Sequence, residues 1–356
     1  MQKTASNKVK VLVVDDSLFF RNIIQKLLEN HKNIEVIAVC NDAIEAEKKL
    51  KEITPDVITC DVEMPVVGGI EFVKKIMSQN PIPILLVSAV SISIFDALHS
   101  GAVDFVKKPN IRNTNDVSRF VKELTDKILV ASRANVRRKE PKILKPAADS
   151  PVILENQRQP RMVIAIGAST GGTEATTQIL QQLSRDIPGI VIVQHMPAGF
   201  THMYAERLNK ICNIRVAEAQ DGDRITCGTA LIAPGERHII VKKDSRGFYV
   251  RCIKGDKVSG HCPSVDMLFK SVAASAGKNA VGIILTGMGK DGAEGLLEMK
   301  RQGAYTIGQD EETSVVYGMP MAAYNIGAVT KQLPLHKIAA DLVEYINSVS
   351  GMCDQI

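Results

Sequence analysis

The sequence lacks closely paired cysteines and long apolar runs. Its 356 residues include seven scattered cysteines, odd in number and never spaced as C-x-x-C: Cys40, Cys60, Cys212, Cys227, Cys252, Cys262 and Cys353. In so long a chain this usage argues against both a disulfide framework and a structural zinc site. No uninterrupted apolar run approaches the roughly 20 residues of a membrane helix, and the polar N-terminus has no signal-peptide core. We therefore expect a reduced, cytoplasmic protein without membrane insertion.

Aromatic side chains are missing from the most basic stretch of the chain. Residues 131–160 hold seven basic and three acidic side chains, which leaves +4 of the total formal charge of +5, together with four prolines and no glycine. Without stacking aromatics or a recognition helix, this stretch is typical of a solvated linker. A DNA-binding regulator is therefore disfavoured, and we expect no nucleic acid among the partners.

The length corresponds to about two domains at a typical ~150 residues each. Apolar residues make up 45% and charged residues 23%, which is ordinary for globular proteins. This composition excludes a disordered chain, a collagen and a coiled-coil rod. We predict a first domain over 1–130, the basic linker over 131–160 and a second domain over 161–350.

The first domain alternates short β-branched runs with helical stretches. The runs lie at 9–14, 34–39, 57–60, 82–87 and 103–106. Five strands alternating with five helices predict a doubly wound α/β domain with a parallel sheet. Such sheets place their sites beyond the carboxyl ends of the strands.

Three aspartates fall at those strand ends. Asp15 and Asp16 follow the first run and Asp61 follows the third. Carboxylates gathered at one edge repel one another unless a cation lies among them, and hard oxygen ligands favour Mg²⁺. Ser88 and Lys108, at the ends of the fourth and fifth runs, could bind phosphoryl oxygens. Any single aspartate here could instead cap a helix; the five positions in this order point to a phosphate site.

The segments VLVVDDS, DVITCDVEMP, LLVSA and GAVDFVKKP resemble the signatures of two-component receiver domains, which have a flavodoxin-like fold. The resemblance implies that a sensor histidine kinase is the phosphodonor and that Mg²⁺ is the cofactor. It implies that Asp61 is the phospho-acceptor and a metal ligand. Asp15 and Asp16 would be the acidic pair around Mg²⁺, and the backbone carbonyl of Glu63 would be a further ligand. Ser88 would be the switch hydroxyl, Phe105 the switch aromatic and Lys108 the lysine that contacts the phosphate. One departure is Gly68, where the family commonly has aspartate.

In the second domain, a strand predicted at 162–166 is followed by GASTGG. A glycine-rich turn between strand and helix can cradle an anion. The same segment reads G-x-S-x-G, which can present Ser169 as a nucleophile. It can also be a tight packing turn, and the segment alone does not decide among the three.

A serine nucleophile needs a base and a group that orients the base. His195 directly ends the apolar run 190–194, and Asp291 follows the run 281–285 at the start of a predicted helix. The three side chains would thus lie at carboxyl ends of one sheet. The order Ser, His, Asp differs from the Ser, Asp, His order of α/β-hydrolases, so the ordinary hydrolase fold is disfavoured. His202, on a polar helix, is expected to be solvated, and no H-E-x-x-H metal motif occurs.

The segments IGASTGG, VQHMP, LIAPG, LTGMGKDGA and SVVYGMP resemble the catalytic domain of chemotaxis protein-glutamate methylesterases, the CheB family, over about 161–348. The resemblance implies a second doubly wound α/β domain, with Ser169 as nucleophile, His195 as general base and acid, and Asp291 as orienting carboxylate. It implies Met288 as an oxyanion-turn residue and Thr170 as a pocket residue. The implied substrates are methyl-accepting chemoreceptors, whose glutamate methyl esters are hydrolysed and whose glutamines are deamidated without a cofactor.

Two hypotheses follow. The first is an esterase in which the unphosphorylated receiver covers the Ser169 cleft and phosphorylation of Asp61 exposes it. The second is a receiver that controls a non-catalytic output domain, which binds a nucleotide or phosphate through GASTGG. We further expect an antiparallel hairpin within 230–252 and a C-terminal helix over 335–348.

Overall fold

The computed structural model describes residues 8–89, 93–110, 113–136 and 162–350. The chain divides into two compact units, Met1–Lys142 and Ile143–Ile356. This division falls within the predicted linker, of which 137–160 lie outside the described residues.

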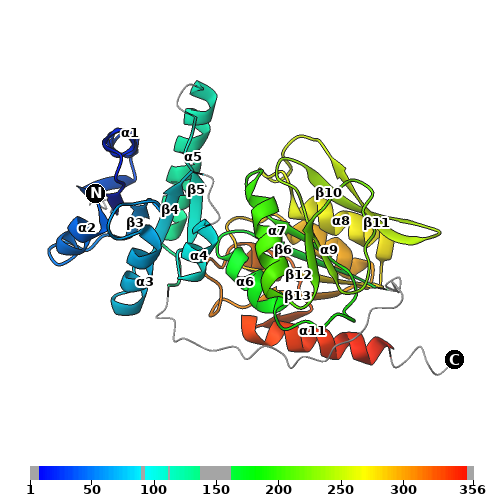
Figure 1. The fold of residues 1–356 in the computed structure, drawn as a ribbon. Coiled ribbons are helices and arrows are strands. Elements are labelled where there is room, and N and C mark those ends of the chain that lie inside the picture. Colours follow the sequence, from blue (N-terminus) through cyan, green and yellow to red (C-terminus); the bar gives the residue numbers. More distant parts are fainter. Residues whose placement is uncertain (1–7, 90–92, 111–112, 137–161, 351–356) are drawn as a thin grey trace, which may run out of the picture. The chain divides into compact units, whose positions relative to one another are not determined.

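The N-terminal unit is a five-stranded parallel sheet with strand order β2-β1-β3-β4-β5. In Figure 1, α1 and α5 lie on one face of this sheet and α2, α3 and α4 on the other. The predicted α/β receiver-type fold is therefore confirmed. The elements, in chain order, are β1 (Val9–Val14), α1 (Leu18–Glu29), β2 (Ile34–Cys40), α2 (Ala43–Lys49), β3 (Val57–Cys60), α3 (Gly69–Gln79), β4 (Ile84–Ser88), α4 (Ser93–His99), β5 (Asp104–Lys107) and α5 (Thr114–Ala131).

Local sequence explains where these elements begin. The apolar strands β3 and β4 are buried along their whole length, as expected for a parallel sheet covered on both faces. The fourth strand starts later than the predicted 82–87 because Pro83 cannot donate a ladder hydrogen bond. At the start of α2, the Asp42 side chain accepts from Glu45 N, and the Glu45 carboxylate accepts in turn from Asn41 N, so two free amides are satisfied reciprocally.

The C-terminal unit is built on a seven-stranded parallel sheet with strand order β14-β13-β12-β6-β7-β9-β8, plus a two-stranded sheet β10-β11. Its elements are β6 (Val163–Ala168), α6 (Gly172–Leu180), β7 (Ile190–Gln194), α7 (Phe200–Ile211), β8 (Arg215–Glu218), β9 (Thr229–Ile232), β10 (His238–Asp244), β11 (Gly247–Ile253), α8 (Val265–Ala276), β12 (Ala280–Ile284), α9 (Ala293–Arg301), β13 (Tyr305–Gln309), α10 (Met319–Asn325), β14 (Lys331–Leu333) and α11 (Leu335–Ser350).

The predicted antiparallel hairpin within 230–252 is confirmed, and of the strands in this part of the chain it includes β10 and β11 but not β9. The pairing of β10 with β11 is antiparallel, but β9 joins the main sheet, parallel to β7 and β8. The reason is visible in the burial. Residues 230–232 of β9 are buried in succession, as in the interior of a parallel sheet, whereas burial in β11 alternates.

The strand order of the large sheet reverses beside β6. From β6 the chain moves through β7 toward one edge, and it returns at β12 to build the other edge through β13 and β14. The carboxyl ends of β6 and β12 therefore flank a topological switch point, which is where open α/β sheets bind their ligands. This point lies where the sequence places GASTGG and LTGMGKDGA.

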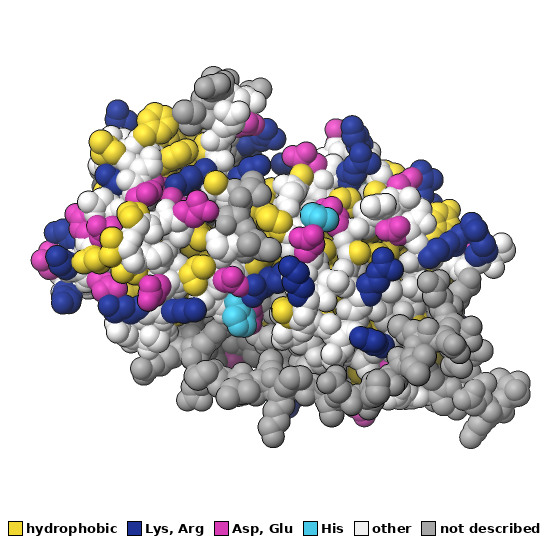
Figure 2. All heavy atoms as spheres, viewed as in Figure 1, with side chains coloured by type: hydrophobic (Ala, Val, Ile, Leu, Met, Phe, Trp, Pro, Cys, Tyr) yellow, Lys and Arg dark blue, Asp and Glu magenta, His cyan; other side chains and the backbone are white. Residues whose placement is uncertain are grey.

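The surface charges, the cysteines and the apolar character of the helices can be read from the structure. In Figure 2, Lys and Arg side chains are mixed with Asp and Glu across the face shown and form no continuous basic stripe. None of the six cysteines in the described part of the chain forms a disulfide there. Among the described helices, none combines the length and apolar character needed to cross a membrane.

Candidate functional site

Strand register brings Ser169 and His195 to the same edge of the sheet. Ala168, the last residue of β6, is in register with Gln194, the last residue of β7. His195 N donates to Ala168 O at 3.1 Å, and Gln194 Nε2 donates to Ser169 O at 2.9 Å. The backbone of the turn after β6 is thus tied to the residue before the histidine.

The turn after β12 closes on Ser169 from the other side. Ser169 N donates to Thr286 O at 3.0 Å. A Cβ on Gly287 would lie 2.6 Å from Ser169 Cβ and 2.5 Å from Met319 Sδ. Real Cβ atoms do not approach so closely, so only glycine lets this turn reach the serine.

His195 and Asp291 form a direct pair: Nε2 lies 2.8 Å from Oδ2, with 7% and 1% of the two side chains exposed. The other ring nitrogen, Nδ1, is buried and has no hydrogen-bond partner among the described residues. No hydrogen bond from Ser169 Oγ to His195 is formed within the described part of the chain, which is common for catalytic pairs without substrate. The pairing leaves Nδ1 as the nitrogen that can accept a proton.

Asp291 was predicted at the start of the helix that follows its strand. It lies directly before Gly292, the N-cap of α9, and its carboxylate binds the N-terminus of a second helix, α8, whose N-cap is Ser264. Its carboxylate accepts from Ser264 Oγ at 2.8 Å, Val265 N at 2.8 Å and Asp266 N at 3.0 Å. The N-terminus of α8, with its free amides, thereby fixes the carboxylate that holds His195.

These contacts determine the charge state of Asp291. Burial raises the pKa of Asp291, but the hydrogen bond and charge of His195 and the amides of Asp266 and Val265 outweigh it, so the pKa lies below its usual value. The neighbouring carboxyl of Asp266 has a raised pKa, chiefly through burial. Asp291 is therefore held in its ionised form, beside a second carboxyl, Asp266, whose pKa is shifted in the opposite direction.

Sequence reasoning missed the segment 258–266. Ser264 is the N-cap of α8, and a serine before the apolar pattern of VDMLFKSV could have indicated a helix start. Nothing in the sequence indicated that this cap also holds Asp291. The ring of His261 stacks on that of His195, at 3.7 Å between centroids.

Three further residues of this unit, Thr170, Met288 and His202, were considered in the sequence analysis. Thr170 is buried, and its carbonyl accepts from Thr286 Oγ1 at 3.0 Å. Met288 is 47% exposed on the turn beside Ser169. His202 is exposed on α7, with Nε2 3.4 Å from Glu206 Oε1, apart from the Ser169 constellation, as expected.

The N-terminal unit gathers its acidic residues at one strand edge. Carboxylate oxygens of Asp15, Asp16 and Asp61 lie within 4.8 Å of one another. Lys108 Nζ lies 2.8 Å from Asp15 Oδ2 and 2.5 Å from Asp61 Oδ2. Burial raises the pKa of Asp15 more than the lysine lowers it, while the two carboxylates raise the pKa of Lys108 against the effect of burial.

This edge suits a hard divalent cation and a phosphoryl group. Three carboxylates supply the oxygen ligands that Mg²⁺ prefers. Ser88 is buried at the end of β4, and its hydroxyl has no hydrogen-bond partner among the described residues. That unsatisfied hydroxyl and the partly buried ammonium of Lys108 are the groups that a phosphoryl oxygen would pair with.

The remaining predicted residues lie around this edge. Glu63 N donates to Asp61 Oδ1 at 3.2 Å. Phe105 is buried, and its carbonyl accepts from Lys127 Nζ at 2.6 Å. A Cβ at Gly68 would meet nothing within 4 Å, so the backbone at this departure from aspartate leaves room for a side chain. Gly69, by contrast, packs its Cα against Asp61 O, where a Cβ would lie at 2.2 Å.

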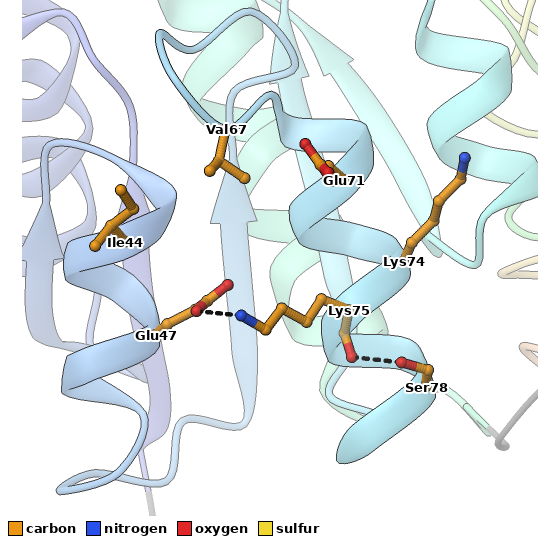
Figure 3. A pocket seen from close by; sticks show the side chains of 7 residues that line it. All are labelled: Ile44, Glu47, Val67, Glu71, Lys74, Lys75 and Ser78. Atoms are coloured by element: carbon orange, nitrogen blue, oxygen red, sulfur yellow. Dashed lines mark hydrogen bonds and ion pairs between the residues drawn. The ribbon is translucent and has the colours of Figure 1, made fainter.

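A separate groove of about 620 Å³ lies between α2 and α3 (Figure 3). Lys75 on α3 pairs with Glu47 on α2 at 2.6 Å and spans the groove. Its lining holds no histidine or cysteine, and its one hydroxyl, of Ser78, donates to Lys75 O. The groove therefore offers no nucleophile–base pair comparable to the constellation at Ser169.

Fold and site together define a class: a receiver-type unit with an acidic strand edge, followed by a parallel α/β unit with serine, histidine and aspartate at its switch point. The model of the family described as CheB methylesterase matches residues 164–342, and that of the response regulator receiver domain matches 11–116. The chain belongs to the CheB methylesterase family, as its resemblance predicted.

Individual relatives agree over nearly the full length. A protein-glutamate methylesterase/protein-glutamine glutaminase 2 of Syntrophomonas wolfei is 51% identical over 96% of this chain and 99% of its own. A protein-glutamate methylesterase/protein-glutamine glutaminase of Sulfurimonas denitrificans is 43% identical over 95% and 99%. The crystal structure of the Thermotoga maritima CheB methylesterase catalytic domain matches with a TM-score of 0.51 and 37% identity, over 52% of this chain and 98% of that one.

Proposed function

We propose that this protein hydrolyses glutamate γ-methyl esters on the cytoplasmic helices of methyl-accepting chemoreceptors, releases methanol, and deamidates receptor glutamines, as part of chemotactic adaptation. The observation that supports this most strongly is the buried His195–Asp291 pair beside Ser169 at the switch point. The names of full-length relatives support the two reaction types, since they describe a protein-glutamate methylesterase and protein-glutamine glutaminase.

In the proposed mechanism, Ser169 Oγ attacks the γ-carbonyl carbon while His195 Nδ1 takes its proton. Nε2–H stays bonded to the ionised Asp291, which stabilises the imidazolium that forms. His195 then protonates the departing methanol, and a water molecule attacks the acyl-enzyme by the reverse sequence. A γ-amide has the same shape as the ester, so glutamine would follow the same path with ammonia leaving.

The developing oxyanion needs N–H donors. Gly287 N is already bonded to Val316 O at 3.0 Å, so of the predicted turn the amides of Met288 and Gly289 are the candidates. A donor of this kind contributes about 3 kcal/mol to transition-state stabilisation. Exposed Met288 and buried Thr170 would line the pocket on either side.

The receiver would control this activity. A chemotaxis sensor histidine kinase would donate a phosphoryl group to Asp61, with Asp15, Asp16 and the Glu63 carbonyl as the further ligands of Mg²⁺. When bound, the cation would neutralise the phosphoryl oxygens. Ser88 and Lys108 would pair with the phosphoryl group, and the response of Phe105 would bias the two units toward an arrangement with Ser169 accessible. We place the protein in the cytoplasm, with the stretch 131–160 as the basic linker between domains 1–130 and 161–350.

The alternative, a phosphate or nucleotide cradle at GASTGG, is not favoured. The glycines of this turn are needed for packing within the chain. A Cβ on Gly171 would lie 2.6 Å from Val315 Cβ, and one on Gly172 would lie 2.5 Å from Gln194 Oε1. The close approaches explain the glycines without a ligand.

Methanol release from methylated receptor membranes tests the proposal. Ser169→Ala should abolish release, whereas Ser184→Ala, at an exposed serine of the same unit, should retain it. Retained release in Ser169→Ala would overturn the assignment of the nucleophile. For the receiver, a small phosphodonor with Mg²⁺ should increase release, and Asp61→Asn should remove that increase only.

A further inference from the structure

His261 lies against one face of the His195 ring. The two imidazole rings are parallel to within 5°, with centroids 3.7 Å apart. This is the contact distance of stacked planar groups, so the face of His195 that His261 covers is closed to water and substrate. The position of His261 in the chain, between predicted elements, gave no sign of this contact.

The backbone around His261 is tightly held. Val258 and His261 exchange both amide hydrogen bonds, each at 3.0 Å. The two residues between them, Ser259 and Gly260, have φ of 52° and 86°, the pattern of a tight two-residue hairpin turn. Ser259 Oγ then donates to Asp266 Oδ2 at 3.0 Å and fixes the turn to the first turn of α8.

One segment therefore positions both groups that contact His195. Residues 258–261 present the His261 ring, and Ser264, Val265 and Asp266 hold the Asp291 carboxylate. The carboxylate bond fixes the position of Nε2, but a single hydrogen bond leaves the ring free to tilt about it. A parallel ring in contact removes that freedom and fixes the direction of Nδ1.

We propose that His261 is a positioning residue for the reaction, which keeps the His195 ring in the plane where Nδ1 can take the proton of Ser169. The inference rests on the proposed function, since it assigns His195 as the base.

The experiment compares four variants of the full-length protein. His261→Phe keeps a flat ring, His261→Leu keeps an apolar side chain without one, His261→Gln keeps a polar group, and His261→Ala removes the bulk. For each, kcat and KM are measured by methanol release from methylated receptor membranes, and the thermal midpoint is measured in parallel. Small errors in the placement of reacting groups can cost about 100-fold in rate.

We expect His261→Leu, His261→Gln and His261→Ala to lower kcat by about 10- to 100-fold with little change in KM. His261→Phe should recover most of kcat, because a flat ring restores the stack. Loss of activity that followed the thermal midpoint, with Phe no better than Leu, would reduce His261 to a packing residue and overturn the inference. Unchanged kcat in His261→Leu would do the same.

The two proposals fail in different ways. If the wild-type protein released no methanol, or if Ser169→Ala kept full activity, the proposed function would fail. If the wild type were active and Ser169-dependent while His261→Leu kept its kcat, only the role of His261 would fail.

Discussion

Gly287 and Ser169 are so close that the glycine cannot be replaced without moving the serine. A Cβ at Gly287 would lie 2.6 Å from Ser169 Cβ. The same residue bonds through its amide to Val316 O and through its carbonyl to Gly318 N and Met319 N. Because both the amide and the carbonyl of Gly287 are hydrogen-bonded, the backbone of this turn is held in place. An added methyl group would therefore displace Ser169.

We predict that Gly287→Ala lowers kcat for methanol release by about 100-fold, the cost of displacing a reacting group by about 1 Å. Gly327→Ala is the matched control in the same unit, since a Cβ there meets nothing within 4 Å, and its φ of 75° adds only a cost in stability. Thermal midpoints separate the two effects. Equal kcat losses in the two variants would contradict the argument.

The second prediction concerns the Asp291 carboxylate. The Asp291 carboxylate only accepts hydrogen bonds, and it accepts them from His195, Ser264 and two backbone amides. In Asp291→Asn, the new side-chain NH₂ must point at one of these donors. We expect a loss of about 10⁴-fold in kcat, because His195 loses its tautomer and its counter-charge. Ser264→Ala removes one bond and leaves the charge, so about tenfold is expected. Kinetics of methanol release at saturating substrate distinguish these magnitudes.

The sequence was sufficient for the fold class and for the residues that end strands. Ser169 and His195 each follow an apolar run directly, so the rule that sites lie at carboxyl strand ends locates them. It could not reveal what holds them. The Asp291 carboxylate binds the N-terminus of α8, which lies earlier in the chain, and the stack of His261 on His195 joins residues 66 positions apart. Both depend on tertiary packing, which no local pattern encodes.

The same limit explains why the sequence did not place β9. A short apolar run before a hairpin could belong to either sheet, because periodicity alone does not separate a buried parallel strand from an antiparallel neighbour. Its place between β7 and β8 is set by packing across the sheet.

The third prediction concerns Lys108, whose ammonium lies between two carboxylates and whose side chain is 12% exposed. Lys108→Met leaves Asp15 and Asp61 without their cation and should destabilise the N-terminal unit by about 3 kcal/mol at pH 7. Burial already holds the pKa of Asp15 above its usual value, and loss of the lysine raises it further. In the variant, the pKa of Asp15 is then higher in the folded state than in the unfolded state. As the pH falls through the folded-state pKa, Asp15 becomes protonated and the variant regains stability.

The difference between Lys108→Met and wild type should therefore shrink from pH 7 toward pH of about 4, the ordinary carboxyl range. Hydrogen exchange of the β1, β3 and β4 amides measures it within this unit. Added Mg²⁺ should also reduce the difference, since it supplies the missing positive charge. A pH-independent difference would show that the lysine acts through packing alone.

The fourth prediction concerns Lys127, which holds the residue predicted as the switch aromatic. Its Nζ donates to Phe105 O at 2.6 Å, pairs with Asp104 at 3.1 Å and Glu123 at 3.2 Å, and lies 5.3 Å from the centroid of the Phe105 ring. Burial lowers the pKa of Lys127, but the two carboxylates outweigh it, so the pKa is raised. Its stabilising contribution is then complete at pH 7 and is lost only as the pH rises through that raised value.

Lys127→Met should destabilise the N-terminal unit by about 2 kcal/mol, because a carbonyl and two carboxylates lose a shared charged donor. Lys122→Met, at an exposed position on the same helix, is the control and should change stability by less than about 0.5 kcal/mol. Hydrogen exchange of β5 and α5 reports the change locally. If Phe105 acts as the switch, basal methanol release should stay near wild type in Lys127→Met while the response to phosphodonor changes. Equal protection of β5 in both variants would show that Lys127 does not hold this strand.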